Sequence, residues 1–359
     1  MVSFSSTRRA LLAGVAVAML AVACGSTNPG SGADVGSGQL TGAGSTFDQP
    51  LFSRAFFDYN QHYAQVTVNY QSVGSGAGIQ QFVKNTVDFG ATDVPMAAAD
   101  IASAGGADKL TQIPVTLGVV SIAYNVSGLT SLQLDADTLS NIYLGKIKKW
   151  NDSAIAGLNP GANLPSKNIV VVYRSDGSGT TYIFTDYLSK VSADWKSTVG
   201  VGKSVKFPVG TGAAQTQGVA QTVSTTDGAI GYVELAYAVQ TNMHTAKLKN
   251  AAGQFVDPTP AGATAAATQN SSVSATNFSI VNEPGATTYP IAGFSWVVLR
   301  TSYDDANKGK ALVLLMKWLV TDGQSEGASL QYAPLPSSVQ QLALTNLKLV
   351  KAGGSPVLS

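Results

Sequence analysis

The sequence predicts an α/β protein built as two lobes. Short apolar segments typical of strands alternate with segments of helical spacing along most of the chain. This order favours parallel or mixed sheets covered by helices. Hydrophobic residues make up 45% of the chain and charged residues 12%, which allows a sizeable core. The length of 359 residues is long for a single domain, so two lobes are expected.

The expected elements follow from periodicity. Residues Leu51, Phe52, Ala55, Phe56 and Tyr59 recur at helical spacing and predict a helix from about Pro50. Structure is expected to begin near Gln39. Further helices are expected at 79–84, 139–143, 182–188, 218–223 and 313–319. Strands are expected at 66–70, 87–91, 115–125, 169–173, 230–233 and 291–299, and the run 115–125 is long enough to bridge two lobes. Residues 250–276, rich in Ala, Thr, Asn and Ser, are expected to form a polar surface excursion.

The N-terminus predicts export and lipid attachment. Arg8 and Arg9 precede an apolar stretch at 10–23, which has the length of a signal-peptide core and is too short to span a membrane. The segment Ala-Val-Ala-Cys-Gly that ends at Gly25 resembles a lipobox, with Cys24 as the lipid-attachment residue. An ordinary secretory signal near a cysteine is the alternative, and the sequence leaves open the general or the twin-arginine export route. Residues 1–23 are therefore expected to be a signal peptide, and 24–38 a flexible tether.

The remaining composition excludes several classes of function. Without residues 1–23 the chain has 20 basic and 21 acidic side chains, so no nucleic-acid partner is expected. Cys24 is the only cysteine, and the two histidines stand in unrelated contexts, so neither a metal site nor another cofactor is expected. No histidine is placed to activate Ser178, so no catalytic residue is assigned and the protein is not expected to be an enzyme.

Three turns rich in glycine and in serine or threonine, each expected to precede a helix, are the candidate ligand-binding segments. They are residues 42–47 (GAGSTF), 74–78 (GSGAG) and 174–180 (RSDGSGT). Glycines allow close backbone approach, a helix N-terminus offers unpaired N–H groups, and Ser and Thr hydroxyls add donors. Together they indicate an anion site built mainly from neutral dipoles. Any one turn alone could be an ordinary helix cap, and none matches a P-loop.

These motifs closely resemble the phosphate-binding subunit of bacterial ABC phosphate importers, over residues 39–345. The similar stretches are 41–47 (TGAGSTF), 73–78 (VGSGAG), 86–93 (TVDFGATD), 142–150 (IYLGKIKKW), 173–180 (YRSDGSGT) and 228–234 (GAIGYVE). The resemblance implies a type II periplasmic-binding-protein fold, with mixed-sheet lobes joined by crossing hinge strands and the ligand in the cleft. Lobe I would comprise 39–124 and 286–359, and lobe II 125–285.

By position, the resemblance also implies the phosphate-binding residues. They are Ser45, Thr46, Phe47, Ser75, Asp93, Arg174, Asp176, Ser178, Gly179 and Thr180. Asp93 would be the acidic acceptor, Arg174 the guanidinium and Asp176 its ion-pair partner. Phe47 is expected to act through its backbone. One departure is Asp48, which stands where the family usually has proline. From the residues alone, Asp93 could equally be an exposed or capping aspartate, and Arg174 with Asp176 a surface pair.

The chemistry of these residues suits phosphate. Phosphate keeps a proton near neutral pH, and sulfate does not. The carboxylate of Asp93 can accept a hydrogen bond from that P–OH group, whereas sulfate would present only lone pairs. Asp176 would cancel much of the charge of Arg174, so the site needs no strongly positive pocket.

The sequence therefore predicts a monomeric lipoprotein outside the cytoplasmic membrane. It would capture inorganic phosphate and deliver it to the permease subunits of an ABC transporter. The alternatives are a binding protein for another oxyanion such as sulfate or molybdate, a secreted phosphatase, and an adhesin that uses the same fold.

Overall fold

The computed structural model describes residues 34–270 and 272–359. The predicted signal peptide, Cys24 and residues 25–33 of the predicted tether lie outside the described residues. The folded body begins earlier than Gln39: Val35 is buried, Asp34 is paired with Lys310 at 2.7 Å, and Gly36 lies against the backbone of Asn307. Residues 34–38 therefore pack on the folded body, and the tether expected there cannot include them.

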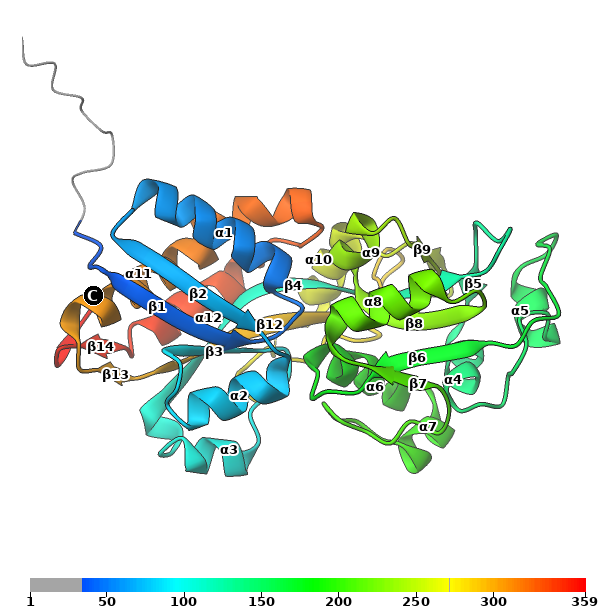
Figure 1. Ribbon diagram of the computed structural model, residues 1–359, viewed down its shortest axis with the longest axis horizontal. Coiled ribbons are helices and arrows are strands. Elements are labelled where there is room, and N and C mark those ends of the chain that lie inside the picture. The colour runs from blue at the N-terminus through cyan, green and yellow to red at the C-terminus, as the bar shows by residue number, and fades with distance from the viewer. Residues whose placement is uncertain (1–33, 271) are drawn as a thin grey trace, which may run out of the picture. The chain divides into compact units, whose positions relative to one another are not determined.

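One large sheet forms the framework of the protein (Figure 1). Its strands run in the order β2 (Val66–Ser72), β1 (Gly38–Gly44), β3 (Phe89–Thr92), β12 (Ala292–Arg300), β4 (Leu110–Asn125), β8 (Ala229–Glu234), β6 (Val170–Arg174) and β7 (Thr211–Ala213), and β9 (His244–Thr245) pairs with β4. Strands β1, β2 and β3 are parallel, as are β6, β7 and β8. The predicted mixed sheet is confirmed.

Strand β4 joins the two halves of this sheet. Its first part pairs antiparallel with β12, from Leu110↔Arg300 to Val119↔Ala292, with a register shift at Val115. Its last six residues, 120–125, pair antiparallel with β8. The strand has 16 residues, and all but the last are buried. We call the part with β1, β2, β3 and β12 the first half-sheet, and the part with β6, β7 and β8 the second half-sheet.

Helices flank both half-sheets (Figure 1). Along the first lie α1 (Gln49–His62), α2 (Ser75–Val83), α3 (Ala98–Ser103), α11 (Ala306–Val320) and α12 (Ser337–Leu347). Along the second lie α4 (Ala136–Tyr143), α5 (Ser153–Leu158), α6 (Gly179–Val191), α7 (Ala193–Thr198), α8 (Gln215–Thr225), α9 (Leu235–Gln240) and α10 (Pro260–Gln269). Short strands and 3-10 turns complete the chain: β5 (Gln133–Leu134), β10 (Lys247–Lys249), β11 (Phe255–Val256), β13 (Ser302–Tyr303), β14 (Lys351–Ala352), β15 (Ser355–Pro356), η1 (Ala107–Lys109) and η2 (Asp322–Leu330).

The predicted helices and strands are present, with shifted ends. The helix expected from 79 begins at Ser75, and the one expected from 182 begins at Gly179, because the glycine-hydroxyl turns already belong to their first turns. In α1 the five residues of the apolar pattern are all buried, as their spacing predicts. The four tryptophans are packing residues: three are fully buried, and Trp318 packs against the core.

The expectation of a polar surface excursion at 250–276 is wrong. This stretch contains α10, whose residues Ala263, Ala266 and Ala267 are buried against β4 and β12. Alanine is weakly apolar, so the helix shows no clear amphipathic pattern. Its start is nevertheless marked in the sequence, because Thr259 caps the helix and Pro260 occupies its first turn.

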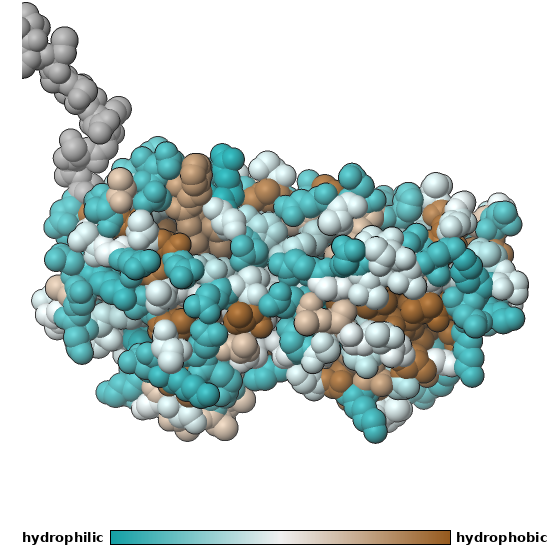
Figure 2. Space-filling view, in the orientation of Figure 1, coloured by the Kyte–Doolittle hydropathy of each residue, from teal (hydrophilic) through white to brown (hydrophobic). Residues whose placement is uncertain are grey.

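The surface shown in Figure 2 is largely polar over the first half-sheet, and its largest apolar area lies in the half that contains β6. A groove of about 490 Å³ opens in that half and is lined by residues that include Ile142, Ile147, Ile169, Val170 and Val209. Among the described residues, no helix combines the length and the apolar character that a membrane span requires.

The two faces of α1 predict opposite responses to substitution. Phe52 is fully buried in the core, and Phe57, on the same helix, is 61% exposed. We expect Phe52→Ala to lower the free energy of unfolding by about 3–5 kcal/mol, since it leaves a cavity. The matched control Phe57→Ala should change it by less than about 0.5 kcal/mol. Urea denaturation measures both, and equal losses would contradict this orientation of α1.

Candidate functional site

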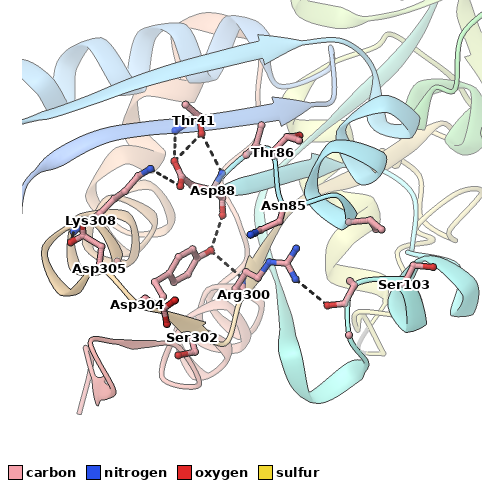
Figure 3. Close-up of a pocket in the computed structure, with 16 residues that line it drawn as sticks. Thr41, Asn85, Thr86, Asp88, Ser103, Arg300, Ser302, Asp304, Asp305 and Lys308 are labelled. Atoms are coloured by element: carbon pink, nitrogen blue, oxygen red, sulfur yellow. Dashed lines mark hydrogen bonds and ion pairs between the residues drawn. The ribbon is translucent and has the colours of Figure 1, made fainter.

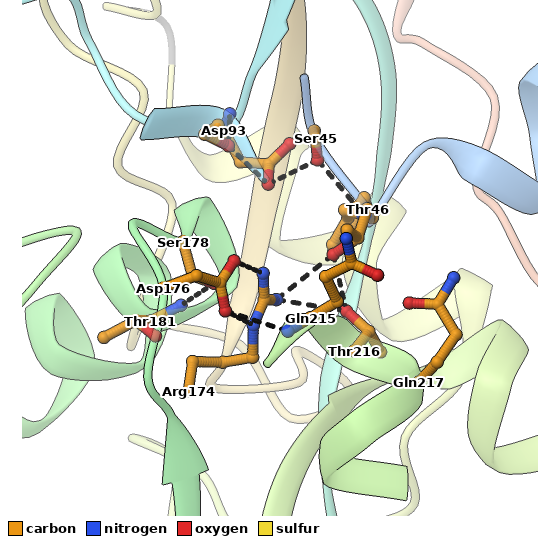
Figure 4. Close-up of polar contacts among 12 residues, drawn as sticks. Ser45, Thr46, Asp93, Arg174, Asp176, Ser178, Thr181, Gln215, Thr216 and Gln217 are labelled. Atoms are coloured by element: carbon orange, nitrogen blue, oxygen red, sulfur yellow. Dashed lines mark hydrogen bonds and ion pairs between the residues drawn. The ribbon is translucent and has the colours of Figure 1, made fainter. Parts of the chain in front are cut away.

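Polar residues follow the carboxyl ends of strands in both half-sheets. Ser45 comes directly after β1, and Asp93 directly after β3. Arg174 is the last residue of β6 and is followed by the turn that opens α6. Ligand sites of α/β proteins form at this end of parallel strands. The structure brings the three predicted turns together at one place, between the two half-sheets. Figure 4 shows residues of the first and the third turn there.

The first half-sheet contributes a carboxylate surrounded by hydroxyls. Asp93 is 1% exposed, and its Oδ2 accepts a hydrogen bond from Ser45 Oγ at 2.7 Å and a long one from Ser75 Oγ at 3.4 Å. Its Oδ1 accepts from Ser295 Oγ at 2.6 Å. Burial raises the pKa of Asp93 to about 6, although these hydroxyls and the charge of Arg174 oppose the rise. Asp93 is therefore a buried acceptor, not an exposed loop aspartate.

The second half-sheet contributes a buried and paired guanidinium. Arg174 Nε donates to Asp176 Oδ1 at 2.8 Å and Nη2 to Asp176 Oδ2 at 2.5 Å, and the Arg174 side chain is only 2% exposed. Asp176 also accepts from the backbone N–H of Gln215 at 2.9 Å. Burial raises the pKa of Asp176, but the hydrogen bonds and charge of Arg174 outweigh it and leave the pKa below its ordinary value. The predicted pair is thus part of the interior.

Contacts across the two half-sheets close the site. Arg174 Nη1 donates to Thr46 Oγ1 at 3.1 Å and to Thr216 Oγ1 at 3.2 Å, and the two threonine hydroxyls lie 2.8 Å apart (Figure 4). The backbone N–H of Gly76 at the start of α2 donates to Gly177 O at 2.9 Å. The N-terminal turns of α2, α6 and α8 therefore meet here, and their dipoles favour negative charge.

The start of α6 explains its Ser-Gly-Thr sequence. Ser178 is the N-cap, and its Oγ accepts from the backbone N–H of Thr181 at 3.1 Å. A Cβ placed on Gly179 would lie 2.3 Å from Asp93 Oδ2, so only glycine lets the helix approach the carboxylate. Thr180 is 1% exposed, and its Oγ1 has no hydrogen-bonding partner among the described residues. A buried, unpaired hydroxyl at a helix start is free to contact a ligand.

Phe47 has a different place from its neighbours. Its ring is fully buried and packs edge-on against Tyr332, with ring centroids 6.0 Å apart. Its backbone N–H donates to Ser45 Oγ at 3.0 Å. The ring therefore serves the core, and only the backbone of Phe47 faces the site hydroxyls.

Sequence reasoning missed four residues of this network. They are Ser295, Gln215, Thr216 and Tyr237, whose hydroxyl donates to Thr46 O at 3.2 Å. Ser295 had a signal, because it is a polar residue in the middle of the otherwise apolar run 292–299 of strand β12. Thr216 had little sequence signal, since a threonine at a helix start is common.

A cavity of about 680 Å³ lies elsewhere and contains none of the predicted site residues (Figure 3). Its basic groups are already engaged. Lys308 Nζ lies 2.7 Å from Asp88 Oδ1, and the guanidinium of Arg300 donates to Ala104 O at 3.0 Å and Phe82 O at 2.6 Å. The groups there hold helix ends and strands together, and we do not assign the ligand site to this cavity.

The two half-sheets and their shared polar centre define a class of binding protein. A family model described as a PBP superfamily domain matches residues 29–322. Solved structures of the same fold include a periplasmic phosphate-binding protein (PfluDING) bound with phosphate, with a TM-score of 0.70 and 24% identity over 86% of this chain and 93% of that one. A phosphate-binding protein from Stenotrophomonas maltophilia has a TM-score of 0.67 and 21% identity over 86% of this chain and 94% of that one. The class is therefore the two-lobed periplasmic-binding type.

Relatives with higher sequence identity show to which family within this class the chain belongs. The phosphate-binding protein PstS of Pasteurella multocida is 44% identical over 84% of this chain and 88% of its own length. That of Xylella fastidiosa strain 9a5c is 42% identical over 88% of this chain and 86% of its own length. The chain belongs to the PstS family of phosphate-binding proteins.

Proposed function

We propose that this protein captures inorganic phosphate outside the cytoplasm and delivers it to an ABC transporter for import. The observation that carries the proposal is a buried carboxylate, Asp93, set among hydroxyl donors and helix N-termini beside a charge-neutralised arginine. The relatives that carry the name phosphate-binding protein support the same ligand. Their names describe binding, so the proposed activity is capture without turnover, and no phosphate release from generic phosphate esters is expected.

The proposed binding residues would contact phosphate in different ways, according to their chemistry. Hydroxyls and backbone N–H groups would donate to phosphate oxygens, the guanidinium of Arg174 would add charge-assisted bonds, and Asp93 would accept from the P–OH group. Asp176 would orient Arg174. The proposed set is Ser45, Thr46, Phe47 (through its backbone), Ser75, Asp93, Arg174, Asp176, Ser178, Gly179 and Thr180, to which the structure suggests adding Thr216.

Capture would require the halves to move. We propose lobe I as 39–124 with 286–359 and lobe II as 125–285, because β4 runs from the first half-sheet, where it pairs with β12, into the second, where it pairs with β8. The contacts of Arg174 with Thr46, and of Gly76 with Gly177, would form as the lobes close. Opening would break them and expose the phosphate to the permease. All the proposed binding residues come from one chain, which supports a monomer as the proposed unit.

Asp93 should set the preference for phosphate over sulfate, the main alternative ligand. Sites that hydrogen-bond a ligand hydroxyl can reject the analogue that lacks it by about 10⁴-fold. Asp93→Asn should therefore reduce the ratio of phosphate to sulfate affinity by at least about a hundredfold. Because the pKa of Asp93 is about 6, the same ratio should fall in the natural protein as pH drops from 7.5 to 5 and the carboxyl gains a proton.

Titration calorimetry with phosphate and with sulfate measures this ratio at each pH. In Asp93→Asn the ratio should be low, and its remaining pH dependence should be that of the protonation of phosphate itself, so the difference between the two profiles isolates the titration of Asp93. Tighter binding of sulfate than of phosphate by the natural protein would overturn the assignment of the ligand. A ratio unchanged by Asp93→Asn would overturn the role of Asp93.

Glycine at position 179 should be needed for closure around phosphate. An added Cβ would lie 2.3 Å from Asp93 Oδ2, so Gly179→Ala must push the two half-sheets apart. We expect phosphate affinity to fall by about 10- to 100-fold, the equivalent of 1–3 kcal/mol of overpacking. Gly157→Ala is the matched control, because nothing lies within 4 Å of a Cβ at that position. Calorimetry that finds equal affinities for the two variants would contradict the closed geometry.

We further propose that Cys24 carries the lipid that holds the protein at the outer face of the cytoplasmic membrane, after removal of residues 1–23. A short tether would raise the effective concentration of the binder near its permease. Metabolic labelling with a fatty acid should mark the natural chain and leave Cys24→Ser unlabelled, while phosphate binding by the purified variant stays normal. Continued lipid labelling of Cys24→Ser would rule out this anchor.

A further inference from the structure

Asp48 is a buried acid whose side chain has no role in its own helix. It stands at the N-cap of α1, where an aspartate usually accepts a hydrogen bond from the first turn, but its side chain makes no such bond. The residue is fully buried. Its Oδ2 lies 2.6 Å from Ser295 Oγ on β12, and its Oδ1 has no hydrogen-bonding partner among the described residues. The side chain is therefore turned inward, away from the helix it begins.

Ser295 links Asp48 to Asp93. The Oγ of Ser295 lies 2.6 Å from Asp48 Oδ2 and 2.6 Å from Asp93 Oδ1. A serine hydroxyl has one proton, so it can donate to only one of the two carboxyl groups. The other short contact needs a proton from the carboxyl itself, because two oxygens without a proton between them repel. The geometry thus requires that one of the two aspartates be protonated.

The surroundings favour Asp48 as the protonated partner. Asp93 receives hydroxyls from Ser45 and Ser75 in addition to Ser295, and it gains from the charge of Arg174. Asp48 receives only Ser295. Burial, the charge of Asp93 and the charge of Glu234 raise the pKa of Asp48 well above its ordinary value, while that of Asp93 rises only to about 6.

The other groups that face Asp48 offer it no positive charge. They are Glu234 at the end of β8, Tyr70 on β2, Tyr237 on α9 and Tyr332 after η2. Glu234 caps α9 through Ala236 N, Tyr70 donates to Ser45 O, Tyr237 to Thr46 O and Tyr332 to Phe47 O. Arg174 is the cation nearest the network and is held by Asp176. A proton is the counter-ion that remains for Asp48.

We propose that Asp48 holds a proton and donates it to Ser295, which in turn donates to Asp93 and keeps Asp93 an ionised acceptor. Asp48 is then a positioning residue for phosphate selectivity, and this role rests on the function proposed above. The relay places the acceptor lone pairs of Asp93 while adding no second negative charge beside the incoming anion. This role would also account for Asp48, an aspartate at a position where the family usually has proline.

Carbon-13 NMR of protein labelled at the aspartate carboxyl carbon tests where the proton lies. Asp48→Asn and Asp93→Asn assign the two signals, since each removes one of them. At pH 7.5 the Asp48 signal of the natural protein should have the shift of a protonated carboxyl, and the Asp93 signal that of a carboxylate. The reverse pattern, or two carboxylates, would overturn the proposal. This measurement needs no phosphate, so it stands apart from the test of the proposed function.

Phosphate binding tests the positioning role. Asp48→Leu removes the donor to Ser295, and we expect phosphate affinity at pH 7.5 to fall about tenfold, the size of one hydrogen bond to a charged group. Asp48→Asn retains an N–H donor and should recover most of that loss. An unchanged affinity in Asp48→Leu, or an Asn variant as weak as the Leu variant, would overturn the role of Asp48.

Ser295→Ala breaks the relay at its centre. The ratio of phosphate to sulfate affinity should fall about tenfold, and its dependence on pH should move to higher pH because Asp93 loses a donor that lowers its pKa. Ser121→Ala is the matched control, since Ser121 is an equally buried serine on β4 that donates to Val233 O. A pH profile that Ser295→Ala leaves unmoved would contradict the relay.

Discussion

The buried ion pair of Arg174 and Asp176 is the interaction on which the site depends. A guanidinium that is 2% exposed is costly unless it is paired, and removing one partner of a buried pair destabilises a protein by about 3–5 kcal/mol. Asp176 satisfies Nε and Nη2, which leaves Nη1 for the hydroxyls of Thr46 and Thr216. The positive charge is thus cancelled locally and yet remains available as a donor at the junction of the two half-sheets.

Buried charge must also be compensated at the acidic groups. Asp48, Asp93 and Glu234 are all buried near this junction, and one paired arginine cannot balance three carboxylates. Burial therefore raises the pKa of all three, and at Asp48 a proton takes the place of a counter-ion. Selectivity for a protonated anion would then depend on which carboxyl keeps its proton. The hydroxyl count around each group decides that, since hydroxyl donors stabilise the ionised form.

Close backbone approach makes this arrangement compatible with the fold. The first turn of α2 and the turn before α6 touch through Gly76 and Gly177, and Gly179 lies against Asp93. Each contact joins one half-sheet to the other, and β4 holds both halves in one continuous sheet. Side chains at these glycines would separate the helix starts from the carboxylate. The glycines noticed first as turn formers are therefore the residues that let the two halves meet.

The sequence by itself determined the α/β class, the long bridging strand and the three turns, because periodicity and glycine-hydroxyl clusters are local properties of the chain. Arg174 lies in one of these turns, and the resemblance to the phosphate-binding family added Asp93 as a site candidate. Only the tertiary structure decided that Ser295 bridges Asp48 and Asp93, and that Thr216 meets Thr46. These contacts join residues separated by 247, 202 and 170 positions. Helix α10 was missed for a related reason, since alanine gains its burial from β4 and β12 and not from its own pattern. The sequence could mark Ser295 as a polar residue within an apolar strand, but it could not identify its partners, because these contacts exist only after the sheet has formed.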